Sequence, residues 1–136
     1  MSSPTVLALT GFIAWALALL ILMEALRARL VMIKQVVSNA FRPDNANLSP
    51  FMQRLARAHA NCVESLPIFG GLMGVALLSG QAALTDPLAL WLLACRVLQS
   101  ACHLASLSVW AVNLRFAAFL VQMVIAAYWA VRLLLT

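Results

Sequence analysis

Four long apolar stretches make up most of this chain, and little sequence separates them. They cover about residues 6–30, 54–79, 88–108 and 114–134, and each is close to the roughly 20 residues that a helix needs to cross a bilayer. Only 10% of the residues are charged and 65% are hydrophobic, whereas a soluble domain has about 25% and 45–50%. We therefore expect an all-α integral membrane four-helix bundle, with residues 1–136 forming a single domain.

The charged residues indicate how these helices are oriented. Six of the nine lysines and arginines flank the connection between the first two stretches, whereas the link near residues 80–87 carries only Asp86. By the positive-inside rule, the first connection, a loop at about residues 38–50, faces the cytoplasm and both termini lie outside. Arg115 agrees with this orientation, and Arg132 does not. We read the net charge of +5 as membrane topology and predict no nucleic-acid partner, because the basic residues form no polar, aromatic-bearing patch.

Local signals indicate where the first two helices end and begin. The first helix is expected to continue beyond the membrane, through Lys34 and towards Ser38. Ser49 followed by Pro50 is typical of an N-cap with proline at the first helical position, so the second helix is expected to begin there. The GxxxG spacing of Gly70 and Gly74 predicts close helix packing.

Polar side chains enter the second apolar stretch at helical spacing. Arg57, Asn61 and Glu64 lie at i, i+4 and i+7, which places a guanidinium, an amide and a carboxylate along one helix face. A charge at the centre of a membrane helix costs roughly 2.5–3.5 kcal/mol on insertion scales. Glu64 is therefore expected to face a bundle interior, a cavity or a partner.

A second polar stripe runs along the third stretch, where Arg96, Gln99 and His103 lie at i, i+3 and i+7. We expect Arg96 and Glu64 both to point inwards, because placing both against lipid costs roughly 5–7 kcal/mol. One interpretation is a buried ion pair that only fixes helix register. The accompanying amides and imidazole exceed what one pair needs and favour a binding site.

Arg115 begins the fourth stretch, at the same end of the bundle as His103 and Glu64. Alone it is typical of a snorkelling anchor, but with it three stretches converge on one region. The cysteines at positions 62, 95 and 102 are odd in number and not in CxxC spacing, so we interpret them as small buried apolar residues. A catalytic Cys62 is the alternative, although it lacks an evident base. We predict no metal site.

The run from Arg57 to Glu64, followed by Pro67 and Phe69, resembles the second-helix signature of the MAPEG family, the membrane-associated proteins in eicosanoid and glutathione metabolism. It is similar to the microsomal glutathione transferase and prostaglandin E synthase branches. The resemblance covers nearly the whole chain in length, number of spans and position of the loops. It implies a homotrimer of four-helix subunits in the membrane, with glutathione bound as co-substrate between neighbouring subunits near the cytoplasmic side.

The resemblance also implies roles for individual residues. The positions that match glutathione-binding residues of the family are Arg57, Asn61, Glu64, Arg96, Gln99 and His103, with Lys34 as a candidate for a basic residue of the first helix. Arg115 matches the arginine that stabilises the glutathione thiolate. His103 departs from the tyrosine of several relatives, and Phe116 and Phe119 replace hydroxyl side chains of prostaglandin synthases. These departures argue against prostaglandin isomerisation more than against glutathione binding.

Three functions remain open at this point. The first is a glutathione-dependent transferase or peroxidase, with Arg115 as catalytic residue, acting on hydrophobic electrophiles or lipid hydroperoxides. The second is a non-catalytic relative that binds a lipid or a partner helix. The third is a small transporter in which Glu64, Arg96 and His103 relay protons or ions, although the chain lacks the paired broken helices of transporter sites.

Overall fold

The computed structural model describes residues 3–105 and 108–136 of the chain. It contains the helices α1 (Pro4–Met32), α2 (Pro50–Leu78), α3 (Ala82–Ala105) and α4 (Val109–Leu134), with no strand in these ranges. Each helix is long and apolar enough to span a membrane. The expected all-α architecture with four membrane helices is therefore confirmed, and the protein is a multi-pass membrane protein.

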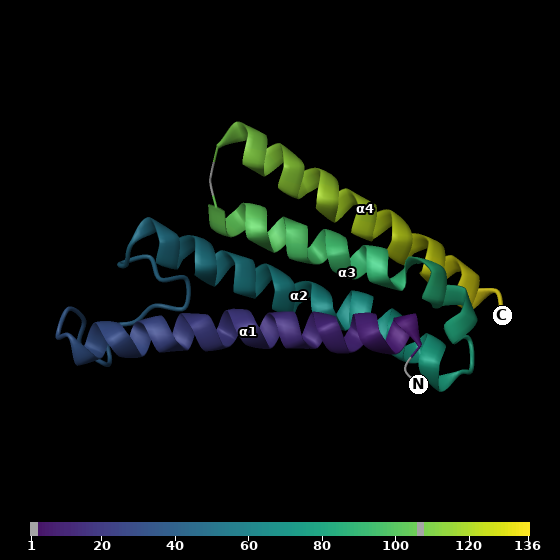
Figure 1. Cartoon of the computed structure of the whole chain (residues 1–136), viewed down its shortest axis with the longest axis horizontal. Coiled ribbons are helices and arrows are strands. Elements are labelled where there is room, and N and C mark those ends of the chain that lie inside the picture. The colour runs from purple at the N-terminus through teal and green to yellow at the C-terminus, as the bar shows by residue number, and fades with distance from the viewer. Residues whose placement is uncertain (1–2, 106–107) are drawn as a thin grey trace.

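Successive helices run in opposite directions (Figure 1). The α1–α2 loop, the end of α3 and the start of α4 lie at one end of the bundle, and the start of α1, the α2–α3 turn and the end of α4 lie at the other. α1 packs against α2 and α3, whereas α4 packs mainly against α3 and touches α2. α4 is consequently the helix with the least cover on its outer side within the single chain.

The first helix is shorter than the sequence indicates. α1 ends before Lys34, which adopts a φ of 61°. The N–H groups of Lys34 and Gln35 donate to the carbonyls of Val31 and Leu30, each at 3.0 Å. This is a Schellman motif, which is usually built on glycine and closes a helix. The expected continuation towards Ser38 was wrong, because lysine at the left-handed position gives no recognisable stop signal.

Of the other helix boundaries, the start of α2 is as predicted, and those of α3 and α4 differ from the prediction. Ser49 caps α2 as predicted, since its hydroxyl oxygen accepts from the N–H of Met52 at 3.3 Å. The α2–α3 link is only a tight turn around Gly80, which has a φ of 74°. α3 therefore begins at Ala82 and carries Pro87 inside it, and α4 begins five residues before the expected position 114. Residues 106 and 107, the predicted end of the third span, lie outside the described residues.

Polar contacts hold α1 in place at both ends of the bundle. At the end with the termini, the Asp86 carboxylate accepts from the backbone N–H of Thr5 at 3.0 Å and from its hydroxyl. At the other end, Arg27 donates to the Asn45 side chain through Nε at 3.0 Å and Nη2 at 2.6 Å, and Asn45 donates to the Met52 carbonyl at 2.7 Å. These contacts join α1 to α3 and fold the α1–α2 loop onto the helices.

Glycine packing is only partly as expected. A Cβ added to Gly70 would lie 3.1 Å from the Leu9 side chain of α1, so α1 and α2 do approach closely at this position. A Cβ added to Gly71 or Gly74 would meet nothing within 4 Å. These two glycines therefore pack against nothing in the single chain.

Candidate functional site

A cleft of about 260 Å³ opens between α2, α3 and α4. It is lined by Asn61, Gln99, His103, Val112, Arg115, Phe116 and Phe119. Four of these residues, one from α2, two from α3 and one from α4, are site residues predicted from the sequence. The cleft lies towards the end of the bundle where α3 ends and α4 begins, because His103 is in the last turn of α3 and Val112 is in the first turn of α4.

The helices around the cleft are held together by a few directional contacts. The Nε–H of Arg54 donates to the Leu104 carbonyl at 2.9 Å, which joins the first turns of α2 to the end of α3. Ser108 caps α4 by accepting from the N–H of Ala111 at 3.3 Å. The last carbonyls of a helix carry partial negative charge, so the guanidinium of Arg54 is favoured at the end of α3. The first hydrogen bond fixes α2 against α3, and the second fixes where α4 begins.

Arg96 points into the bundle, as expected, but it does not line the cleft. It is only 1% exposed, and its Nε–H donates to Oε1 of Gln122 at 3.0 Å. Its guanidinium carbon lies 5.3 Å from the ring centre of Phe12 and 5.7 Å from those of Phe69 and Phe119. The Nη2 atom has no hydrogen-bond partner among the described residues. Cation–π contacts and one amide therefore hold this charge.

Gln122 is a site component that the sequence interpretation missed. It is fully buried on α4, and its amide nitrogen donates to Oε1 of Gln99 at 2.8 Å and to the Ala118 carbonyl at 3.1 Å. It connects the buried Arg96 to the wall of the cleft. The signal was present, because Gln122 lies seven residues after Arg115 and so shares its helix face in an otherwise apolar stretch.

Glu64 does not point into its own bundle. Its side chain is exposed, and the ion pair found among the described residues joins Arg27 and Glu24 at 3.1 Å. The expectation that Glu64 points inwards was therefore wrong for the single chain, and the alternative interpretation, a buried ion pair with Arg96, is not supported by the described residues. The error came from treating the face of α2 as one site, because a helix face can turn towards a partner as well as towards its own bundle.

The exposed face of α2 has a regular composition. Arg57, Glu64, Gly71 and Leu78 follow one another at intervals of seven residues, and all four are exposed. We call this set the outer stripe of α2. Asn61, which lines the cleft, lies four residues after Arg57 on the same helix. The outer stripe and the cleft are therefore neighbours on α2.

Two other sequence candidates lie outside the cleft. Lys34 is exposed in the turn that ends α1 and is not part of the cleft wall. Cys62 is fully buried and also absent from that wall, which disfavours its role as a nucleophile and supports the interpretation as a buried apolar residue. Among the described residues, no group of three or more His, Cys, Asp or Glu side chains is placed to hold a metal ion.

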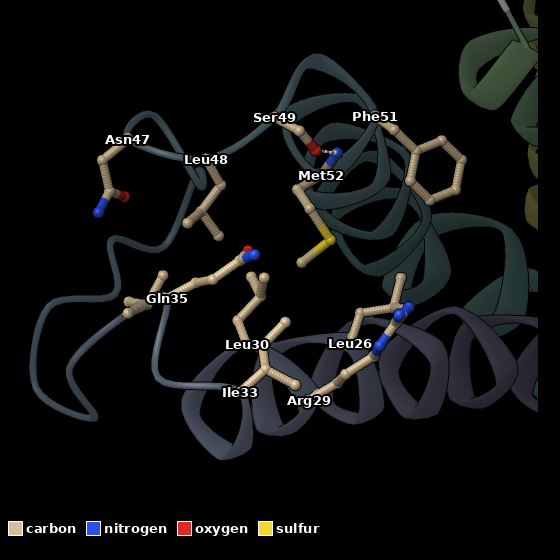
Figure 2. A pocket seen from close by; sticks show the side chains of 11 residues that line it. Leu26, Arg29, Leu30, Ile33, Gln35, Asn47, Leu48, Ser49, Phe51 and Met52 are labelled. Atoms are coloured by element: carbon tan, nitrogen blue, oxygen red, sulfur yellow. Dashed lines mark hydrogen bonds between the residues drawn. The ribbon is translucent and has the colours of Figure 1, made fainter.

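A larger cavity of about 520 Å³ lies between the end of α1, the loop and the start of α2 (Figure 2). Its walls are mainly apolar, with Leu26, Leu30 and Met52 facing the space, and Arg29 is its one charged residue. It contains none of the residues that the sequence predicted for the site. The smaller cleft, where several polar groups converge, is the better candidate for chemistry.

The cleft combines positive charge with aromatic surface. Arg115 supplies a cation, Asn61, Gln99 and His103 supply polar groups, and no acidic side chain lines the wall among residues 3–105 and 108–136. The rings of Phe116 and Phe119 form the remaining side. Such a wall suits an anionic group attached to, or placed beside, an apolar one. The volume lies below the roughly 300–1,000 Å³ of ordinary ligand pockets, so one chain encloses only part of a larger ligand.

Comparison with known proteins identifies one family. The family model described as the MAPEG family matches residues 5–135, nearly the whole chain. Neither a curated protein nor a solved structure matches the chain.

Proposed function

Because the chain belongs to the MAPEG family, the membrane proteins of eicosanoid and glutathione metabolism, we propose that it is a glutathione-dependent transferase or peroxidase. Its substrates are hydrophobic electrophiles or lipid hydroperoxides. The observation that carries the proposal is the cleft in which Asn61, Gln99, His103 and Arg115 converge from three helices.

The polar groups match the chemistry of glutathione. The tripeptide carries two carboxylates, an ammonium and a thiol. Arg115 stabilises the thiolate in the cleft, and Asn61, Gln99 and His103 hydrogen-bond the adjacent peptide. Arg57 and Glu64 on the outer stripe bind a carboxylate and the ammonium, since guanidinium and carboxylate groups form strong charge-assisted hydrogen bonds. Arg96 does not contact glutathione directly but supports Gln99 of the cleft wall through Gln122. Lys34 remains a candidate for a contact with glutathione outside the cleft.

The reaction follows from a stabilised thiolate. Its sulfur attacks the electrophilic carbon of a substrate, a carbon–sulfur bond forms, and the leaving group departs with its electron pair. With a hydroperoxide, the sulfur attacks the distal oxygen and an alcohol leaves; a second glutathione then releases water and forms the disulfide. Phe116 is 60% exposed on α4 and also lines the cleft, so it marks the route by which an apolar substrate enters from the bilayer.

A homotrimer explains the outer stripe. Arg57 and Glu64 are exposed on a helix that is otherwise apolar enough to span the membrane. Leaving one such charge against lipid costs roughly 2.5–3.5 kcal/mol, so a second copy of the chain should cover them. Glutathione between two subunits would contact the cleft of one and the outer stripe of the next. The basic loop supports a cytoplasmic position for this site.

The proposal is tested by assaying the purified protein in lipid nanodiscs. Conjugation of 1-chloro-2,4-dinitrobenzene to glutathione and reduction of cumene hydroperoxide are the two readouts, and calorimetry measures glutathione binding. Activity with either substrate supports the proposal. Protein that retains its fold but neither binds nor uses glutathione contradicts it.

One observation favours the second candidate function, a non-catalytic protein that binds a lipid or partner. Among the described residues, no hydroxyl side chain lines the cleft, and Phe116 and Phe119 occupy part of its wall. A phenylalanine supplies no hydrogen bond to a thiol or to a leaving oxygen. If calorimetry shows lipid binding without a glutathione signal, this second function is correct.

A further inference from the structure

The buried amide of Gln122 has one chemically allowed orientation. The Arg96 Nε–H can only donate, so the atom of Gln122 that faces it at 3.0 Å must be the oxygen. The Ala118 carbonyl can only accept, so the atom that faces it at 3.1 Å must be the nitrogen. Both ends of the Gln122 amide are therefore determined by groups that cannot reverse their role.

This orientation passes to Gln99 on the neighbouring helix. The Gln122 nitrogen lies 2.8 Å from Gln99, and because it donates, Gln99 must present its oxygen to it. The oxygen of Gln99 is thus occupied inside the bundle. Its amide nitrogen has no acceptor among the described residues, although Gln99 is only 3% exposed and lines the cleft.

From this chain of donors we infer that Gln122 is a positioning residue, which sets the Gln99 amide so that only N–H donors face the cleft. Gln99 can then hydrogen-bond an anion or a neutral acceptor, but it offers no acceptor of its own. Together with the cation of Arg115, these N–H donors favour a ligand that places a thiolate, carboxylate or sulfonate beside Gln99 on α3. The identity of that ligand as glutathione rests on the proposed function, but the polarity of the wall does not.

Gln122→Glu reverses the direction of the hydrogen bond between residue 122 and Gln99 with little change in side-chain shape. A glutamate oxygen still accepts from Arg96, but its other oxygen accepts as well, so Gln99 must rotate and donate its N–H groups inwards. The Gln99 oxygen then faces the cleft and repels anions. Gln99→Leu removes the amide, and the double variant shows whether Gln122 acts through Gln99. Gln81→Glu, which adds the same charge in the turn at the far end of the bundle, is the control.

Binding in nanodiscs is measured with benzenesulfonate, a permanent anion, with methyl phenyl sulfone, its neutral analogue, and with glutathione. We expect Gln122→Glu to weaken benzenesulfonate binding roughly tenfold or more, because a hydrogen bond to a charged group is lost and an oxygen faces the anion instead. Sulfone binding should weaken less, because the hydrogen bond lost there is to a neutral acceptor, and Gln81→Glu should bind both probes as the wild type does. In the Gln99→Leu background, Gln122→Glu should cause no further loss.

Equal benzenesulfonate affinity of wild type and Gln122→Glu overturns the inference. So does a loss that persists undiminished in the Gln99→Leu background, since the added charge or a loosened bundle then explains it. If the wild type does not bind benzenesulfonate, the inference fails even where glutathione binds. If the wild type and the variants behave as expected with benzenesulfonate but none binds glutathione, the proposed function fails and the inference stands.

Discussion

Arg96 and Gln122 meet inside the bundle, where the guanidinium Nε–H donates to the amide oxygen at 3.0 Å. Three phenylalanine rings surround the guanidinium, and no described carboxylate forms an ion pair with it. Cation–π contacts contribute about 0.5–2 kcal/mol each and do not satisfy N–H donors. The Gln122 amide is therefore important both for stability and for the cleft.

Gln122→Leu should destabilise the bundle strongly. The change leaves the Nε–H of Arg96 without its acceptor and the Gln99 oxygen without its donor, and a hydrogen bond to a charged group contributes about 1.5–3 kcal/mol. Equilibrium unfolding in mixed micelles measures this loss. Met123→Leu, at the adjacent and partly exposed position, should change stability by less than about 0.5 kcal/mol. A Gln122→Leu protein as stable as wild type would show that the relay is not formed.

Arg115→Ala should lower kcat for conjugation by roughly 10²–10³, in the range seen when a group that stabilises developing or bound negative charge is removed. Arg115→Lys should retain part of the activity, since it keeps the charge but not the planar donor geometry. The control is Arg132→Ala, because Arg132 is exposed and contacts Tyr128 on α4. Steady-state kinetics separates kcat from KM. Equal losses in both alanine variants would remove Arg115 from the catalytic role.

Much of the fold could be predicted from the sequence because membrane helices depend on a simple physical requirement. A stretch that is apolar for about 20 residues must form a helix in lipid, so the number and order of the helices followed from composition alone. The boundaries were harder. Lys34 follows the end of α1 in a left-handed conformation, which a lysine in the sequence does not predict. Pro87 lies inside α3, whereas the sequence placed it before the helix.

The sequence predicted the position of several candidate residues within one chain, but not what the exposed face of α2 would contact. Helical spacing correctly placed Gln99 and His103 on one inward face, and both line the cleft with Arg115. Helical spacing predicts which residues share a helix face, but it does not predict what that face contacts. Glu64 was therefore expected to point into its own bundle and is instead exposed. Gln122 was missed because a single amide in an apolar stretch has meaning only through its partner on another helix.

Asp86→Ala should destabilise the protein without changing the cleft. The carboxylate accepts from both the N–H and the hydroxyl of Thr5 at the start of α1, where a negative charge is also favoured by the helix dipole. Loss of these charge-assisted hydrogen bonds should cost about 1.5–3 kcal/mol. Unfolding in mixed micelles measures the cost, and glutathione affinity should stay unchanged because Asp86 lies at the end of the bundle away from the cleft. Reduced affinity at full folding would contradict this separation.

Glu64→Gln should weaken glutathione binding at least about tenfold, since a carboxylate that pairs with the ammonium of a bound ligand is replaced by a neutral amide. The exposed Glu64 forms no ion pair with any other residue that the structure describes, so the stability of the monomer should not change. Calorimetry with glutathione is the measurement. Glu24→Gln, which removes the same charge from α1, should lose only its weak local pair with Arg27. Unaltered affinity in Glu64→Gln would exclude the outer stripe from the binding site.

The association of subunits through the outer stripe can be tested at Gly71, which lies one repeat of seven residues beyond Glu64. A Cβ at this position meets nothing within 4 Å in the single chain, so Gly71→Leu introduces no clash inside the subunit. If a second copy packs here, the added side chain separates the two helices, because close approach in membranes depends on small residues. We expect native mass spectrometry to show the trimer replaced by monomers, together with loss of glutathione binding. Ala127→Leu, on the exposed side of α4, is the matched control and should leave the trimer intact. A Gly71→Leu trimer as abundant as the wild type would place the subunit contact on another face and leave Arg57 and Glu64 without the cover that their charge in lipid requires.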